Sequence, residues 1–234
     1  MADENVHKGH RKRMKAKFLL HGFDVLEEHE VLEMLLYYAV PRSDTNPIAH
    51  KLLDHFGSIS AVFDASIDML LDAGVSENTA VLLKMIPDLS RLYLDDKYNN
   101  PSKVIDLSKI VDYFACKFIG REDEAVMLLL TDAKGKEVYS GIVAKGSINS
   151  TDLPVRKIID LALRYNAKLA IIAHNHPSGV AIPSKDDLSA TKIIQNALAH
   201  VNVILADHVV IADDDGVSMA SSEFGNGIFY SFND

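Results

Sequence analysis

Two histidines one residue apart, His174 and His176, are the best candidates in this sequence for binding a metal ion. They follow the apolar run 169–173, which predicts a buried strand, and the alternation of side chains along a strand turns both imidazoles to one face. Neutral imidazoles are common ligands of divalent metals such as zinc. The pair alone is weak support, because ten histidines in 234 residues give roughly 0.4 such pairs by chance. Two polar residues at a strand end are the ordinary alternative.

A third ligand is expected at the start of the next helix. The residues at 177–179 predict a turn, and Ser184 and Asp187 stand in the first turn of a helix expected over 184–200. A carboxylate there can approach a pair of histidines at a strand end, and two imidazoles with one carboxylate would leave a metal position open for water. The Ser-x-x-Asp spacing also resembles a capping box. If Asp187 is the cap, Asp186 is the alternative ligand.

The combined spacing resembles the signature of the JAB/MPN (JAMM) metalloproteases at every position: His174-x-His176-Pro177, six residues, Ser184, two residues, Asp187. The string HNHPSG at 174–179, with the later Pro183-Ser184 and Asp207-His208, resembles the bacterial RadC-like branch of that superfamily. The resemblance implies a zinc ion on His174, His176 and Asp187. It also implies that the chain cleaves a peptide or isopeptide bond of a peptide or protein substrate with metal-activated water.

Two further residues take roles from this resemblance. The family uses a glutamate on an early strand of the metal domain, and 124–130 is similar to that strand, so Glu124 is the candidate base. It would take a proton from water and return it to the leaving amine, while Ser184 would help hold the oxyanion. Without the family, Glu124 would be one of three solvated acidic residues at 122–124. His208 could be a fourth ligand, an orienting partner of an imidazole or a core residue, and we favour the last two.

The elements that position these residues predict two domains, joined in the polar stretch 98–102. Residues 1–100 have helical periodicity, whereas 101–234 alternate strands with helices, which indicates an α/β fold. In the second domain we expect helices over 107–118, 154–166 and 184–200, and strands over 125–130, 137–143, 169–173, 203–205 and 209–212. The resemblance implies an N-terminal helix-hairpin-helix-like all-α domain, followed by a JAB/MPN-type mixed sheet flanked by helices.

The first domain raises an alternative function, because a basic cluster near the N-terminus could contact DNA phosphates. Its members are Lys8, Arg11, Lys12, Arg13, Lys15 and Lys17. In the hairpin at 74–80, however, Ser76 stands in place of the second glycine and Glu77 adds a negative charge. We therefore expect a degenerate hairpin that serves packing or protein contacts. The alternative is a DNA-associated, repair-type binding protein with a structural or sensing metal. A nuclease ranks last, because phosphodiesterase sites commonly use more carboxylates and two metals.

Composition limits the remaining classes. Hydrophobic residues make up 48% and charged residues 24%, as in an ordinary globular protein. The single cysteine, Cys116, excludes an intrachain disulfide and a cysteine-based zinc cage, and it is expected to be a buried, inert thiol. The net charge is −9, and neither half is basic overall. Because no apolar run approaches the roughly 20 residues of a membrane span and the N-terminus lacks a signal-peptide pattern, we expect a cytoplasmic protein.

Overall fold

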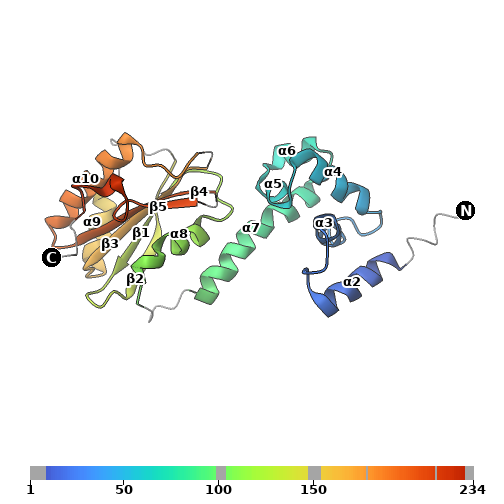
Figure 1. The fold of residues 1–234 in the computed structure, drawn as a ribbon, viewed down its shortest axis with the longest axis horizontal. Coiled ribbons are helices and arrows are strands. Elements are labelled where there is room, and N and C mark those ends of the chain that lie inside the picture. The colour runs from blue at the N-terminus through green and yellow to red at the C-terminus, as the bar shows by residue number, and fades with distance from the viewer. Residues whose placement is uncertain (1–8, 99–103, 147–153, 178, 214, 230–234) are drawn as a thin grey trace, which may run out of the picture. The chain divides into compact units, whose positions relative to one another are not determined.

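The computed structural model describes residues 9–98, 104–146, 154–177, 179–213 and 215–229. The chain divides into two compact units, Met1–Ser90 and Arg91–Asp234 (Figure 1). The division falls inside helix α7 (Glu77–Tyr98), before the expected boundary at residue 100. The expected linker at 98–102 lies almost wholly outside the described residues. Among the described residues, no helix combines the length and apolarity needed to cross a bilayer.

The first unit is helical, as expected. It contains α2 (His10–His21), α3 (Glu28–Leu36), α4 (Asn46–Phe56), α5 (Ile59–Asp64), α6 (Ile67–Asp72) and the start of α7. Its core is aliphatic and includes the fully buried Leu32, Leu52 and Leu83. Thr45 is the N-cap residue of α4, and Asp44 just before it accepts the backbone N–H of Asn46 at 3.1 Å.

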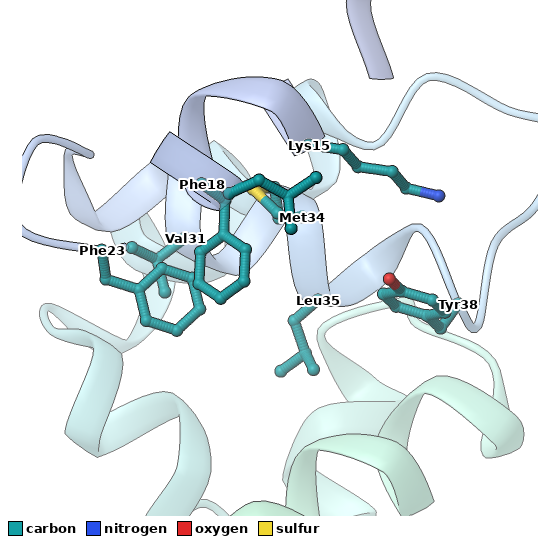
Figure 2. Close-up of a pocket in the computed structure, with 8 residues that line it drawn as sticks. Lys15, Phe18, Phe23, Val31, Met34, Leu35 and Tyr38 are labelled. Atoms are coloured by element: carbon teal, nitrogen blue, oxygen red, sulfur yellow. The ribbon is translucent and has the colours of Figure 1, made fainter. Parts of the chain in front are cut away.

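The expected helical hairpin is formed by α6 and α7. Gly74, with φ of +89°, turns the chain between them, and Ser76 accepts the backbone N–H of Thr79 at 3.3 Å at the start of α7. Ser76 therefore serves the helix that follows it. Elsewhere in this unit, α2 and α3 line an open apolar pocket of about 360 Å³, whose lining includes Phe18, Phe23, Val31, Met34 and Leu35 (Figure 2).

The second unit is built on a five-stranded mixed sheet, which confirms the expected fold class. The strands are β1 (Ala125–Thr131), β2 (Glu137–Lys145), β3 (Leu169–Asn175), β4 (Ile204–Ala212) and β5 (Asp215–Ser218), in the spatial order β2-β1-β3-β4-β5. Only β3 and β4 are parallel, and α10 (Lys185–Ala199) connects them. The carboxyl end of β3 thus lies close in sequence to the start of α10, where the candidate ligands stand.

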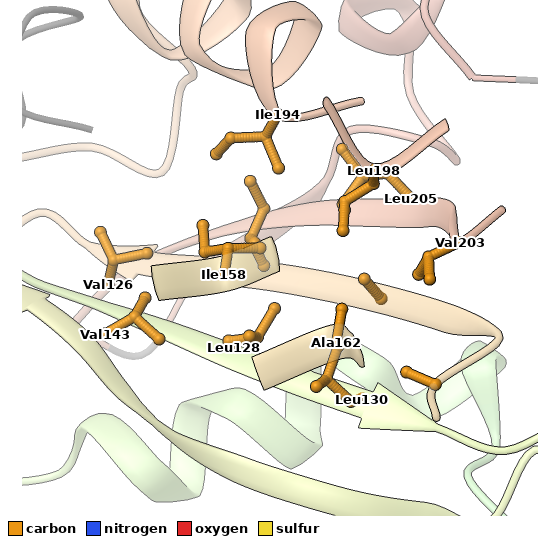
Figure 3. Packing of buried hydrophobic residues seen from close by; sticks show 13 residues of the cluster. Val126, Leu128, Leu130, Val143, Ile158, Ala162, Ile194, Leu198, Val203 and Leu205 are labelled. Carbon is orange, nitrogen blue, oxygen red and sulfur yellow. The ribbon is translucent and has the colours of Figure 1, made fainter. Parts of the chain in front are cut away.

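Helices cover both faces of this sheet. On one face, α9 (Val155–Arg164) and α10 contribute Ile158, Ala162, Ile194 and Leu198 to a core with alternate strand residues (Figure 3). The other face packs against α8 (Ile110–Phe118), which follows the short 3-10 helix η1 (Leu107–Lys109). A second short 3-10 helix, η2 (Glu223–Gly225), follows the last strand. Cys116 on α8 is only partly buried, because it lies beside the inward-facing row of that helix.

Two expectations about the last strands are wrong. The separate strands predicted over 203–205 and 209–212 form the single strand β4, and β5 was not expected. Asp207 and His208 interrupt the apolar pattern, yet both are buried inside β4 with polar partners. Asp207 accepts hydrogen bonds from the Ser218 hydroxyl and the Ala220 backbone N–H, so it ties β4 to the chain after β5.

Candidate metal centre

The site begins where β3 ends. His174 lies in β3 and is 1% exposed, and His176 follows the strand with its side chain partly exposed. The backbone N–H of His176 donates to the backbone carbonyl of Ile211 at 2.7 Å, so hydrogen bonding to β4 continues past the last residue of β3. Gly179 then lets the chain turn closely, because a Cβ at that position would lie 3.2 Å from His176 Cβ.

Asp187 enters the site from the first turn of α10, and its two carboxylate oxygens have different partners. The backbone N–H and the hydroxyl of Ser184 donate to Oδ2 at 2.7 and 2.6 Å, and Ser184 Oγ accepts the Asp187 N–H at 3.1 Å. This is a capping box. The other oxygen, Oδ1, lies 3.2 Å from His174 Nε2. Asp187 therefore takes part in the capping box and is also the candidate ligand, whereas Asp186 is exposed and outside the cluster.

The three candidate ligands are brought together at distances that suit a metal ion. The Nε2 atoms of His174 and His176 are 2.9 Å apart, and His176 Nε2 is 3.7 Å from Asp187 Oδ2. Four ligands arranged as a tetrahedron around zinc, at about 2.0–2.1 Å, would lie about 3.3 Å from one another. Two imidazole nitrogens and one carboxylate spaced in this way could hold a small divalent ion.

A chain of hydrogen bonds behind His174 fixes which of its nitrogens faces the cluster. Thr191 Oγ1 lies 2.5 Å from the carbonyl of Asp187 and 2.6 Å from His208 Nδ1. Because a carbonyl can only accept, the hydroxyl donates to it and accepts from His208 Nδ1. His208 Nε2 then accepts from His174 Nδ1 at 2.8 Å. Burial is the main reason that the pKa of His208 lies well below its ordinary value, and the neighbouring His174 lowers it further. The His208 imidazole is therefore neutral.

This bonding turns the Nε2 atoms of both histidines toward the cluster. His176 Nδ1 donates to the carbonyl of Val180 at 3.1 Å, just as His174 Nδ1 donates to His208. The two Nε2 atoms lie 2.9 Å apart and face the carboxylate of Asp187, in a group of side chains that could hold a metal ion. Burial raises the pKa of Asp187, but bonds from His174 and Ser184 outweigh it and leave the pKa below its ordinary value. The carboxylate is therefore ionised at neutral pH.

Glu124 and Ser184 lie beside this cluster and are not among its ligands. The pairing of β1 with β3 ends with Val126 opposite His174, and beyond it the side chain of Asn175 bonds to the residues on either side of Glu124. Glu124 is partly exposed. Ser184 donates its only hydroxyl proton to Asp187 Oδ2, so donation to an oxyanion requires this hydroxyl to rotate. The catalytic roles of both residues stay predictions.

Two residues with a part in the site were not found from the sequence. Thr191 is four positions after Asp187 in α10, so helical spacing alone places both on one face and could have indicated it. Asn175 lies between the two histidines, and its side chain bonds to the segment that carries Glu124. Strand alternation turns Asn175 away from the histidines, and no sequence signal indicates that it reaches β1. His208 is the orienting partner of His174, as favoured above.

Replacing His208 with Leu is expected to weaken zinc binding. The change removes the acceptor that fixes His174 Nδ1, and loss of such an orienting partner typically costs about 10- to 100-fold in metal affinity. Competition with a chromogenic chelator would measure the affinity. The control is His200→Leu, at an exposed position after α10. Equal affinities of His208→Leu and the parent would show that His208 does not orient the ligand.

The comparisons with known proteins agree with this geometry. The family model described as the RadC-like JAB domain matches residues 104–224, a range that includes every residue of the candidate centre. The UPF0758 protein FN0909 of Fusobacterium nucleatum subsp. nucleatum is 32% identical over 216 residues, which cover 89% of this chain and 93% of that protein. Its name states no activity, so the function must be argued from the site.

Proposed function

The chain belongs to the RadC-like JAB domain family, and we propose that it is a zinc-dependent hydrolase of peptide or isopeptide bonds. The observation that supports this most is the convergence of two imidazole Nε2 atoms with one carboxylate. Structural zinc sites are closed by four protein ligands, whereas catalytic sites use three and keep one position for water or substrate. A site of two histidines and one aspartate belongs to the second kind.

The residues around the centre supply the rest of the proposed chemistry. A zinc ion bound there would lower the pKa of water and polarise the scissile carbonyl. Glu124, which directly precedes β1 in a segment bonded to Asn175, would accept a proton from the attacking water and deliver it to the leaving amine. Ser184, exposed at the start of α10, would turn its hydroxyl from Asp187 toward the developing oxyanion. When the Ser184 hydroxyl turns away, Asp187 Oδ2 still accepts the hydrogen bond from the Ser184 backbone N–H.

Metal content and cleavage test this proposal together. The purified chain is expected to hold about one zinc per molecule, and to cleave members of a fluorogenic library of α-peptide and lysine ε-isopeptide bonds. Cleavage should stop on chelation and return with added zinc. A chain that takes up no stoichiometric zinc after reloading would contradict the proposal. So would cleavage that is indifferent to the chelator.

DNA binding by α2 is a second candidate function, favoured by the exposure of Lys12, Arg13 and Lys15 on that helix. The rest of the basic cluster is less available. The guanidinium of Arg11 donates to the carbonyls of Val40, Pro41 and Ser43, and Lys17 pairs with Glu30 at 2.9 Å. Lys8 lies outside the described residues. Any phosphate contact of α2 would therefore come mainly from the three exposed side chains.

Exchanging Lys12, Arg13 and Lys15 for Gln tests this candidate. If the three contact phosphates, affinity for duplex DNA should fall, and the slope of log K against log salt should lessen by about 0.9 per lost contact. Fluorescence anisotropy at several salt concentrations would measure both. The matched control exchanges three exposed lysines of the second unit, Lys134, Lys168 and Lys192. Absence of measurable affinity of the parent at low salt would remove DNA binding as a function of this chain.

A further inference from the structure

Asn175 joins β3 to the segment that carries Glu124. It is 4% exposed, and its carboxamide makes two hydrogen bonds across the sheet. The backbone N–H of Ala125 donates to Asn175 Oδ1 at 2.8 Å, and Asn175 Nδ2 donates to the carbonyl of Asp123 at 3.2 Å. The two backbone groups belong to the residues immediately before and after Glu124. The side chain therefore holds the chain on both sides of the candidate base.

This contact replaces strand pairing where the pairing stops. The β1–β3 register ends with Val126 opposite His174, so Glu124 lies beyond it. On the side of β2, the backbone N–H of Gly146 donates to the carbonyl of Glu124 at 2.7 Å. On the side of β3, the carboxamide of Asn175 provides the hydrogen bonds. The backbone of the segment is thus held from both neighbouring strands, which leaves the Glu124 side chain as the part that can face the metal centre.

The chemistry of a carboxamide suits this task. It offers one acceptor and one donor a short distance apart, which matches the N–H and C=O that it meets. A carboxylate would keep the acceptor but could not donate to Asp123. An alanine would leave the buried N–H of Ala125 and the part-buried carbonyl of Asp123 without these partners. Asn175 also follows His174 and precedes His176 in the chain, so displacement of the Glu124 segment and of the ligands is coupled through one short stretch of backbone.

We propose that Asn175 is a positioning residue that sets Glu124 over the metal centre, an inference that rests on the proposed hydrolase function. Asn175 is not among the clustered ligands, and its carboxamide is occupied by the two backbone hydrogen bonds. It acts by fixing the distance between the proton acceptor just before β1 and the two histidines at the carboxyl end of β3. Because a displacement of about 1 Å can cost about 100-fold in rate, a clamp of this kind has a measurable effect on turnover.

The test compares Asn175→Ala, Asn175→Asp, Glu124→Gln and the double variant Asn175→Ala/Glu124→Gln, with Asn196→Ala at an exposed position of α10 as control. Asn175→Ala should keep one zinc per chain and exchange its Ala125 amide hydrogen at least about tenfold faster than the parent. Its kcat should fall about 10- to 100-fold with little change in KM. Added to Glu124→Gln, the same substitution should cause no further loss of activity.

A readout without turnover separates this inference from the proposed function. Zinc should shift the carboxyl ¹³C resonance of Glu124 in the parent, and Asn175→Ala should lose most of that shift. If the parent shows the shift but cleaves nothing, the hydrolase proposal fails while the positioning role stands. An unchanged shift in Asn175→Ala, or an equal loss of kcat in the Glu124→Gln background, would overturn the positioning role. Should Asn175→Ala fail to fold, Asn175→Asp, which keeps the acceptor for Ala125, provides the same comparisons with smaller expected effects.

Discussion

Glu124→Gln should retain one zinc per chain and lose about 10²- to 10⁴-fold in kcat, the range typical of general acid–base catalysis. Glutamine has nearly the same size and shape as glutamate, but its amide cannot accept and return a proton. Zinc retention is expected because Glu124 is not part of the cluster formed by His174, His176 and Asp187. Metal analysis and steady-state hydrolysis of a substrate identified from the library would measure the two effects separately.

The neighbouring Asp123→Asn provides the matched control for this change. Asp123 is exposed, and its contact with Asn175 uses the backbone carbonyl, which the substitution leaves in place. This control should therefore cleave like the parent. Loss of zinc from Glu124→Gln would mean that Glu124 is a ligand or supports one, and undiminished turnover would mean that the proton acceptor lies elsewhere.

Asp187→Asn should remove the metal. Zinc content is expected to fall from about one to below about 0.1 per chain after dialysis, because the site loses its only anionic donor, and the rate should fall with it. The change separates the two roles of the Asp187 carboxylate, which are to accept the capping bonds from Ser184 and to bind the metal. An asparagine can still accept the capping bonds from Ser184 through its one oxygen, while its amide group then faces the histidines. Asp187→Ala loses both roles, whereas Ser184 remains the N-cap of α10, because its hydroxyl accepts a backbone N–H that alanine keeps.

The control for the ligand variant is the adjacent Asp186→Asn, which removes the same charge from an exposed position on the first turn of α10. It should keep zinc and activity. A similar loss of zinc from both variants would mean that charge near the helix start matters and direct ligation by Asp187 does not. Thermal unfolding of both variants in the presence of chelator would show whether Asp187→Asn has disturbed the helix itself.

The elements nearest the site were predictable from the sequence because their patterns are local. β1 and β3 contain the unbroken apolar runs 125–130 and 169–173, and α10 follows the recognisable N-cap residue Ser184. The expected bounds of these elements differ from the structure by one or two residues. Periodicity and turn chemistry act over a few residues, so they need no knowledge of tertiary contacts.

The polar interior of the second unit could not be predicted in this way. Asp207 and His208 looked like a break between strands, because a buried polar pair is unfavourable unless partners are supplied. Those partners are Ser218 and Thr191, 11 and 17 residues away in the sequence. Until the fold brings them together, nothing local shows that β4 can continue through the pair.

The choice between cap and ligand at Asp187 could not be made from the sequence either. The capping role and the ligand role both depend on the same Ser-x-x-Asp spacing. They exclude each other only if the carboxylate is counted as a single acceptor instead of two oxygens. In the structure, Asp187 Oδ2 accepts a hydrogen bond from Ser184, and Oδ1 faces His174. The orientation of a side chain about its own bonds is set by packing and hydrogen bonds, which sequence spacing does not contain.

Anomalous diffraction at the zinc edge from crystals of the zinc-loaded chain tests the metal centre most directly. We expect one strong peak per chain within about 2.0–2.2 Å of Nε2 of His174, Nε2 of His176 and Oδ1 of Asp187, with the fourth position held by solvent. A peak at other residues, a fourth protein ligand that closes the site, or no peak in crystals grown with excess zinc would contradict the account.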